Sequence, residues 1–306
     1  MCQPAIVGTD EKASAALVDA KESFKRILLQ HRGDAARPEV KDALELLIQT
    51  AANDRGRGDG GGRREEWSPA LNEDANAGRW RTITTPPFPG KLPDDVADAD
   101  GKSRFTLGRM TFGLFKPTKL VCAVEEIVNV VQAEAKDGTC STKEEQHKDE
   151  DAPAWSSTYN FEVLMEIETP TAKLPAMLTN HGVCFPKSKE RLGVKFTRCV
   201  LEPRFDLSNP ENATLAAVWK ETFDKAIAKE AEAQSHVGWA GTWLMHKLMK
   251  MMMGLEPPID TSDFTQTFTM SKPFVGHLDL LYLDDDFRIS KGNRGTIVAV
   301  ERMAEK

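Results

Sequence analysis

The stretch YLDDDFRISKGNRGTIVAVER, residues 282–302, must be read as a metal site, a phosphate loop or the last strands of a sheet. Its three acids, residues 284–286, are consecutive, so an extended chain cannot turn all of them towards one ion. A phosphate loop is followed by a helix, whereas Gly295 is followed by the strand-forming run Thr-Ile-Val-Ala-Val. The stretch therefore predicts strands joined by an acidic turn and a Gly-Asn turn, with Arg288 and Arg294 paired to the acids.

Strand patterns extend back from this stretch to residue 79. In STYNFEVLMEIET, residues 157–169, apolar residues alternate with mostly polar neighbours, as in a strand with one buried face. Eight further candidates are residues 79–85, 104–115, 119–133, 173–185, 191–203, 263–271, 276–285 and 295–302. Nine or ten consecutive strands with mostly short connections predict a closed antiparallel barrel or a strongly curved sheet, because closure removes exposed edges.

Two helices are predicted before the strands. Leu17, Phe24 and Leu28 recur at helical spacing, Gly33 ends this helix, and Pro38 begins a second. The Gly- and Arg-rich run that follows is typical of a flexible linker. We therefore divide the chain into an N-terminal helical segment (1–52), a linker (53–77) and a β-barrel (78–306).

A second helical pair is predicted inside the barrel sequence, at about residues 211–253. Its first half has a regular apolar stripe, and its second half places Trp239, Trp243, Met251 and Met252 on one side. The pair either packs across an end of the barrel or docks to a membrane surface or a partner protein. Tryptophans and methionines with lysines at the edge suit the docking interpretation.

Composition excludes several classes of function. The net charge is −7, which argues against general nucleic-acid binding, and no apolar run approaches the length of a membrane span. The five cysteines form no CxxC pair, so neither a zinc site nor a disulfide framework is indicated, and a reducing compartment is favoured. The first residues carry no visible signal or transit peptide.

The sequence shows no catalytic constellation. GxSxG, P-loop, HExxH and dinucleotide fingerprints do not occur, and the six histidines are scattered. His181 and Cys184 lie three apart in a predicted strand, where their side chains point to opposite faces. We expect no enzyme activity and no metal site.

The C-terminal signature, with its acidic turn, Arg288-Ile289-Ser290 and Gly292–Gly295, closely resembles that of the plastid lipid-associated protein family, also called plastoglobulins or plastid fibrillins. The paired N-terminal helices, GRWRTITT with Trp80, LGRMTFGLFKPTKL and IVNVV are similar to family blocks in the same order. The resemblance implies a mainly β, lipocalin-like barrel in the plastid, at thylakoids or plastoglobules. It also implies binding of carotenoids, prenylquinones or acyl lipids, with no obligatory cofactor. The helices at 211–253 look like an insertion in this pattern.

An eight-stranded or larger barrel leaves room for a small ligand. The predicted lining residues are Trp80, Phe112, Phe161, Met165, Phe196 and Tyr282, with Arg198 as a polar anchor. The main hypothesis is a non-enzymatic protein that binds or organises hydrophobic molecules while peripherally attached to a membrane. The alternative is a structural or assembly subunit that docks to a thylakoid photosynthetic complex through Trp239, Trp243, Met251 and Met252. A barrel enzyme acting on an isoprenoid is a third reading.

Overall fold

The computed structural model describes residues 14–55, 67–93, 101–133, 154–233, 259–260, 264–271, 273 and 275–304. The chain divides into two compact units, Met1–Glu66 and Trp67–Lys306. The predicted second inserted helix, with Trp239, Trp243, Met251 and Met252, lies outside the described residues, as do residues 56–66 of the predicted linker.

The first unit contains the predicted N-terminal helical pair, α1 (Ala15–Gln30) and α2 (Pro38–Arg55). The Ser14 side chain caps α1 by accepting a hydrogen bond from the backbone N–H of Leu17. Between the helices, Gly33 has a φ of 79°, a left-handed conformation that suits glycine. Phe24 and Leu28 are fully buried.

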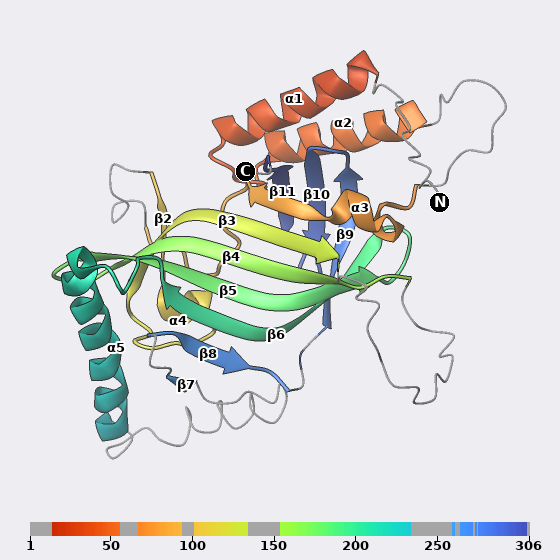
Figure 1. Ribbon diagram of the computed structural model, residues 1–306. Coiled ribbons are helices and arrows are strands. Elements are labelled where there is room, and N and C mark those ends of the chain that lie inside the picture. The colour runs from red at the N-terminus through yellow and green to blue at the C-terminus, as the bar shows by residue number, and fades with distance from the viewer. Residues whose placement is uncertain are drawn as a thin grey trace, which may run out of the picture. The chain divides into compact units, whose positions relative to one another are not determined.

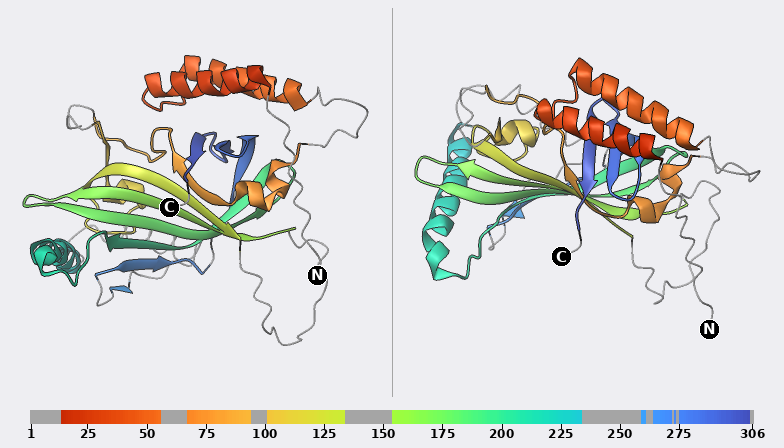
Figure 2. Two further views of the ribbon diagram at one scale, coloured as in Figure 1. Left: turned by 45° about the horizontal axis from the view of Figure 1, so that its top comes forward. Right: turned by 90° about the horizontal axis from the view of Figure 1, so that it is seen from above.

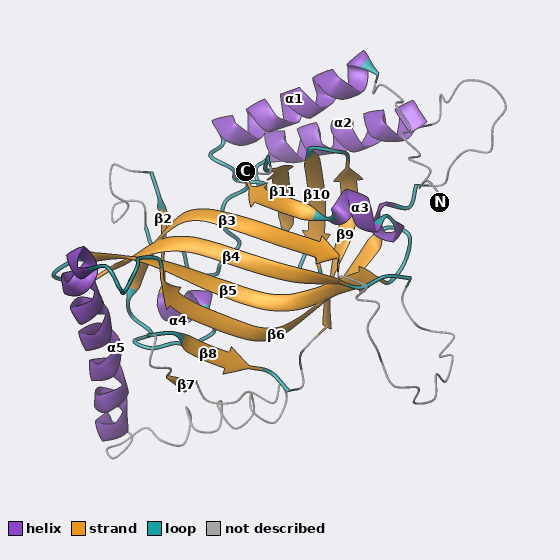
Figure 3. Cartoon of the chain, in the orientation of Figure 1, coloured by secondary structure: helices purple, strands orange, loops and turns teal. Residues whose placement is uncertain are grey.

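The second unit is built on an antiparallel sheet that closes into a ring (Figures 1 and 3). Neighbouring strands follow the order β5-β4-β3-β1-β11-β10-β9-β6, and β6 also pairs with β5. The strands of the ring are β1 (Gly78–Thr82), β3 (Val121–Ala133), β4 (Ser157–Glu168), β5 (Lys173–Pro186), β6 (Arg191–Pro203), β9 (Val275–Leu283), β10 (Phe287–Gly292) and β11 (Ile297–Arg302). The predicted mainly β fold with a barrel-like sheet is confirmed.

The ring has a long-stranded and a short-stranded part. Strands β3 to β6 are 12 to 14 residues long and curve side by side (Figure 2). By contrast, β1 has 5 residues and β10 and β11 have 6 each. Outside the ring, β2 (Ser103–Thr106) pairs with β3, while β8 (Gln266–Thr269) pairs with β6 and with β7 (Ile259–Asp260). Most of the barrel wall is therefore formed by the long strands β3 to β6, and the shorter strands close the ring.

The strand predicted at residues 104–115 is only partly correct. The alternation ends after β2, and the chain continues as the short helix α4 (Leu107–Met110) and a turn. A Cβ on Gly108 would lie 2.7 Å from the Thr118 side chain, so this glycine permits a close packing of the segment on itself. The apolar side chains of α4 thereby enter the barrel.

The acidic run 284–286 forms the predicted turn between β9 and β10. Asp284 accepts hydrogen bonds from the backbone N–H groups of Asp286 and Phe287, and its other carboxylate oxygen accepts from the Tyr282 hydroxyl at 2.7 Å. The Gly-Asn turn joins β10 to β11, with Gly295 at a φ of 83°. One part of the prediction is wrong: Arg288 does not pair with the acids, because its side chain is buried inside the barrel.

The first inserted helix is present as α5 (Ala213–Ala233), preceded by the short helix η2 (Pro210–Asn212). Figure 1 shows α5 at one end of the long strands. Trp219 is 1% exposed and donates from Nε1 to the Phe264 carbonyl at 3.1 Å. Since Trp219 and Phe223 belong to the core cluster of the barrel, this helix packs on the end of the barrel.

Candidate ligand site inside the barrel

Alternate residues of the ring strands share a face that points into the barrel. On β4, Val163 and Met165 are buried, whereas Leu164 between them is half-buried. Residues that pair across neighbouring strands lie on the same face of the sheet. Trp80 pairs with Asn129 and Asn129 pairs with Phe161, so all three lie on the inner face.

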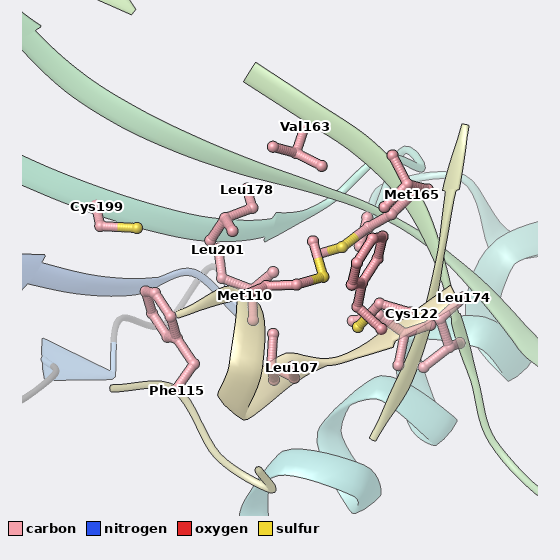
Figure 4. Packing of buried hydrophobic residues seen from close by; sticks show 14 of the residues in the cluster. Leu107, Met110, Phe115, Cys122, Val163, Met165, Leu174, Leu178, Cys199 and Leu201 are labelled. Carbon is pink, nitrogen blue, oxygen red and sulfur yellow. The ribbon is translucent and has the colours of Figure 1, made fainter. Parts of the chain in front are cut away.

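One end of this interior, which we call the apolar end, is filled by hydrophobic side chains (Figure 4). Leu107 and Met110 of α4 meet Val163 and Met165 of β4 and Leu178 of β5. All five are buried, the most accessible being Met110 at 5% exposed. The apolar end is a packed hydrophobic core.

The opposite, polar end is organised around Arg288 of β10, which is 3% exposed. Its guanidinium carbon lies 4.8 Å from the centre of the Trp80 ring, and Nη2 donates to Oδ1 of Asn129. Burial lowers the pKa of Arg288, although an arginine stays protonated at neutral pH. The other terminal nitrogen, Nη1, is buried without a hydrogen-bond partner among the described residues.

A second arginine, Arg302 of β11, also lies over Trp80 and donates hydrogen bonds to the backbone. Its guanidinium carbon lies 4.1 Å from the centre of the Trp80 ring. It donates to the carbonyls of Ala75, Ala77 and Asp285, which tie β11 to the start of β1 and to the acidic turn. A Cβ on Gly78, whose φ is 115°, would lie 2.6 Å from Nη1 of Arg302, so the position requires glycine. Arg302 is thus a structural residue.

Next to Arg288 lies a small cluster that includes Tyr159 and Cys184. Burial raises the pKa of each to about 12, and the positive charge of Arg288 partly opposes the shift. Trp155 packs against the same cluster, and its indole Nε1–H is also buried without a partner. The polar end therefore presents two unsatisfied donors, on Arg288 and Trp155, around one largely apolar cluster.

A cleft of about 300 Å³ opens beside β3, and its lining includes the inner-face residues Val124 and Ile127. It lies where β2 pairs with β3 up to Val124 and β1 pairs with β3 only from Val128. Its lining residues are Thr82, Thr84, Pro86, Gly101, Lys102, Ser103, Val124, Glu125, Glu126 and Ile127. The hydroxyls of Thr82 and Thr84 are buried without a hydrogen-bond partner in the part of the chain that the structure describes. Val124 and Ile127 also belong to the hydrophobic cluster of the apolar end, and Ile127 is two residues from Asn129 on the same strand.

Two charged residues at the rim of the cleft, Lys102 and Glu125, form ion pairs. Lys102 Nζ lies 3.0 Å from a Glu125 oxygen and 2.8 Å from a Glu166 oxygen, and Arg204 Nη1 lies 2.9 Å from the other Glu125 oxygen. The hydrogen bonds that Lys102 donates to Glu166 and Glu125 raise its pKa. Burial raises the pKa of Glu125, but the bonds from Lys102 and Arg204 outweigh it and the pKa is lowered. The rim is therefore fixed by ion pairs.

Four of the predicted lining residues lie on the inner face. Trp80 and Met165 are fully buried, and Phe161 and Phe196 are half-buried. The Phe196 ring contacts Tyr159, with centroids 6.0 Å apart, which places it at the polar end. Met165 belongs to the apolar end. Contact of any of these side chains with a ligand stays a prediction.

Three of the predicted lining and anchor residues are placed elsewhere. Arg198 is exposed and lies opposite His181, because a bulge in the β5–β6 pairing turns it to the outer face. Tyr282 is buried, but it pairs with Ile289 after a bulge in the β9–β10 pairing. Ile289 is the neighbour of the inward-facing Arg288, so Tyr282 lies on the outer face of the sheet. Phe112 is 68% exposed in the turn after α4.

The residues that the sequence reasoning missed are Arg288, Trp155, Thr82 and Thr84. The available signal was in FRIS, where Arg288 and Ser290 must face opposite to Phe287 and Ile289. The structure buries all four residues. The cysteines Cys122, Cys184 and Cys199 are buried, and burial raises the pKa of each to about 12, so they stay protonated thiols at neutral pH.

The described residues place no three His, Cys, Asp or Glu side chains so that they could hold a metal ion. Within the same ranges, no helix has the length and apolar character of a membrane span.

In a comparison with protein families, the family model PAP_fibrillin matches residues 160–301. This range runs from β4 to β11 and includes Arg288, whereas Trp80 on β1 lies before it. Neither the curated proteins nor the solved structures contain a match to the chain.

Proposed function

Because the chain carries a domain of the plastid fibrillin family at residues 160–301, we propose that it is a non-enzymatic plastid protein that holds small hydrophobic molecules inside its barrel. The family supports a lipid-associated role. The carotenoids, prenylquinones and acyl lipids that the family resemblance implies are the candidate cargo. Thylakoids or plastoglobules are the proposed location, and the contact with them is peripheral.

The observation that carries this proposal is the cleft beside β3. Its volume of about 300 Å³ lies at the lower end of the range for small-molecule sites. It is lined by the inner-face residues Val124 and Ile127, and it also contains the unsatisfied hydroxyls of Thr82 and Thr84. Most of the lining is polar or charged, so Pro86, Val124 and Ile127 provide the apolar surface that a hydrophobic molecule would contact on entry to the barrel.

The first prediction is that the full-length protein carries extractable small molecules. Protein purified gently from its own plastids is extracted with organic solvent, and the extract and the co-eluting polypeptides are analysed by mass spectrometry. We expect a carotenoid, quinone or acyl lipid at close to one molecule per barrel. An extract no richer than that of an unrelated plastid protein would count against the proposal.

The same measurement tests the alternative function, a docking subunit of a thylakoid complex. The packed apolar end favours this alternative, since a barrel filled by its own side chains serves as a rigid scaffold. A ligand-free barrel that elutes with a pigment–protein complex would support it. Trp239, Trp243, Met251 and Met252 would then be the first positions to mutate.

The turn after α4 is the described surface that best suits peripheral membrane contact. Phe112 is 68% exposed and has a φ of 53°, an unfavourable conformation for an aromatic residue. The sequence from Arg109 to Lys119 contains three basic residues and no acid, although the whole chain has a net charge of −7. An exposed aromatic ring among basic residues is suited to an anionic bilayer surface.

We therefore predict that Phe112→Ser weakens binding to vesicles containing phosphatidylglycerol by about 3- to 10-fold, because burial of one aromatic side chain is lost. Co-sedimentation with vesicles measures this effect. The matched control is Leu71→Ser, which removes an apolar side chain that is 44% exposed and distant in sequence. Equal binding of the two variants and the wild type would exclude this turn as the contact.

A further inference from the structure

The buried guanidinium of Arg288 needs a partner that the described protein groups do not supply. Nη2 is bound to Asn129 and the guanidinium lies over Trp80, but Nη1 has no acceptor. The ionisable groups that act electrostatically on the Arg288 guanidinium are Tyr159, Cys184 and Arg302. Tyr159 and Cys184 are uncharged at neutral pH, and Arg302 is itself positive, so none of the three supplies a negative charge. A buried charge is costly unless an opposite charge or hydrogen-bond acceptors compensate for it.

We propose that Arg288 binds the carboxylate of an amphipathic ligand whose apolar tail extends along the inner face towards the cleft. The ligand class is a long-chain monocarboxylic acid, either a fatty acid or an isoprenoid acid. This inference rests on the proposed function and specifies the head group of its cargo. An arginine is the side chain best suited to bind a carboxylate by charge and hydrogen bond together.

The polar end favours a single negative charge on the ligand. The guanidinium of Arg302 donates hydrogen bonds to three backbone carbonyls. This second arginine therefore has a structural role. Glu73 accepts a hydrogen bond from Ser157 at 2.6 Å and acts electrostatically on Cys184, which places a negative charge at the same end. A doubly charged phosphate would be repelled there, whereas one carboxylate matches one arginine.

A neutral head group satisfies the site less well. A quinone carbonyl would accept one hydrogen bond from Nη1, but it would leave the buried positive charge uncompensated. The indole N–H of Trp155, beside Tyr159 and Cys184, is a second donor at this end. A carboxylate would supply both the acceptor that Nη1 of Arg288 lacks among the described residues and the opposite charge.

The tail has an apolar surface on which to lie. Asn129 is two residues from Ile127, which lines the cleft, and it lies opposite the half-buried ring of Phe161. Beyond Phe161 on the same face are Val163 and Met165 of the apolar end. Because the apolar end is packed by its own side chains, a tail that reaches it must displace them, and the adaptable side chain of Met165 is suited to such a rearrangement.

The test compares acids with their methyl esters on the full-length protein. Palmitic acid and palmitic acid methyl ester, and phytanic acid and its methyl ester, are titrated into the delipidated wild type. We expect each acid to bind at least tenfold more tightly than its ester. Arg288→Met keeps the length of the side chain and removes the charge, and it should bind acid and ester equally. The preferred acid distinguishes a fatty-acid from an isoprenoid ligand.

Arg198→Met is the matched control, because Arg198 lies on the outer face and its replacement should leave the acid preference unchanged. Circular dichroism and the unfolding temperature show whether Arg288→Met still folds. Loss of a buried charge is not expected to unfold the protein, since apolar replacements at buried ionic sites are often tolerated.

A second readout is the ¹³C signal of carboxyl-labelled palmitic acid bound to the wild type. Paired with Arg288, the carboxylate should stay ionised when the pH is lowered through the usual carboxyl pKa of about 4–5. In a variant such as Arg288→Met, the signal of any bound acid should titrate.

The outcomes separate this inference from the proposed function. If esters bind as tightly as acids to the wild type, the container function stands and the carboxylate anchor is wrong. If acids, esters and neutral isoprenoids all fail to bind, the proposed function itself fails. An acid preference that survives Arg288→Met would assign the anchor to another residue.

Discussion

Trp80→Ala is expected to lower the free energy of unfolding of the barrel by about 3–5 kcal/mol, as for other large buried aromatic side chains. The Trp80 side chain is fully buried, and its Nε1 donates to the Asn76 carbonyl at 3.0 Å. The guanidinium groups of Arg288 and Arg302 both lie over the Trp80 ring. Removing the ring therefore leaves a cavity next to two positive charges. Urea denaturation followed by circular dichroism measures the change.

The control for Trp80 is Phe112→Ala, which removes another aromatic ring from an exposed position. We expect this control to change the free energy of unfolding by less than about 0.5 kcal/mol. A Trp80→Ala variant as stable as Phe112→Ala would mean that the polar end contributes little to the stability of the barrel.

Arg302→Met should lower the free energy of unfolding by about 3 kcal/mol, because hydrogen bonds from a charged donor to three backbone carbonyls are lost. These carbonyls belong to Ala75, Ala77 and Asp285, on both sides of the junction between β1 and β11. The loss should therefore appear first as local opening. Hydrogen exchange of the backbone amides of β1 and β11 should accelerate more than that of β4 and β5.

Arg294→Met provides the comparison for Arg302, since Arg294 is exposed in the turn before β11. This variant should leave both the unfolding free energy and the exchange of β1 unchanged. Uniform acceleration of exchange across all strands in Arg302→Met would contradict a local role at the junction.

Much of the barrel could be predicted because its strands are long and alternate regularly. In β4, the pattern from Tyr159 to Ile167 places one face inside, and the structure agrees. The turns at residues 284–286 and around Gly295 were also predictable, since acidic and glycine residues interrupt strand-forming runs. These signals are local, and each depends only on a few neighbouring residues.

The inner lining was harder to predict because single bulges reverse the alternation. Arg198 and Tyr282 follow such bulges, and both were assigned to the wrong face. A bulge depends on the partner strand, so the sequence of one strand does not reveal it. Arg288 was predicted to pair with the acids of the turn, but both faces of β10 are buried and its side chain lies inside the barrel.

The pairing of β1 with β11 also constrains folding during protein synthesis. Arg302 hydrogen-bonds a carbonyl 227 residues earlier in the chain, at Ala75. At typical translation rates of about 5–20 residues per second, β1 is made roughly 10–45 s before its partner on this side. Throughout that interval the nascent chain presents an unpaired strand edge, which invites aggregation. Ribosome-associated chaperones are therefore expected to protect the barrel until β11 emerges and the ring closes.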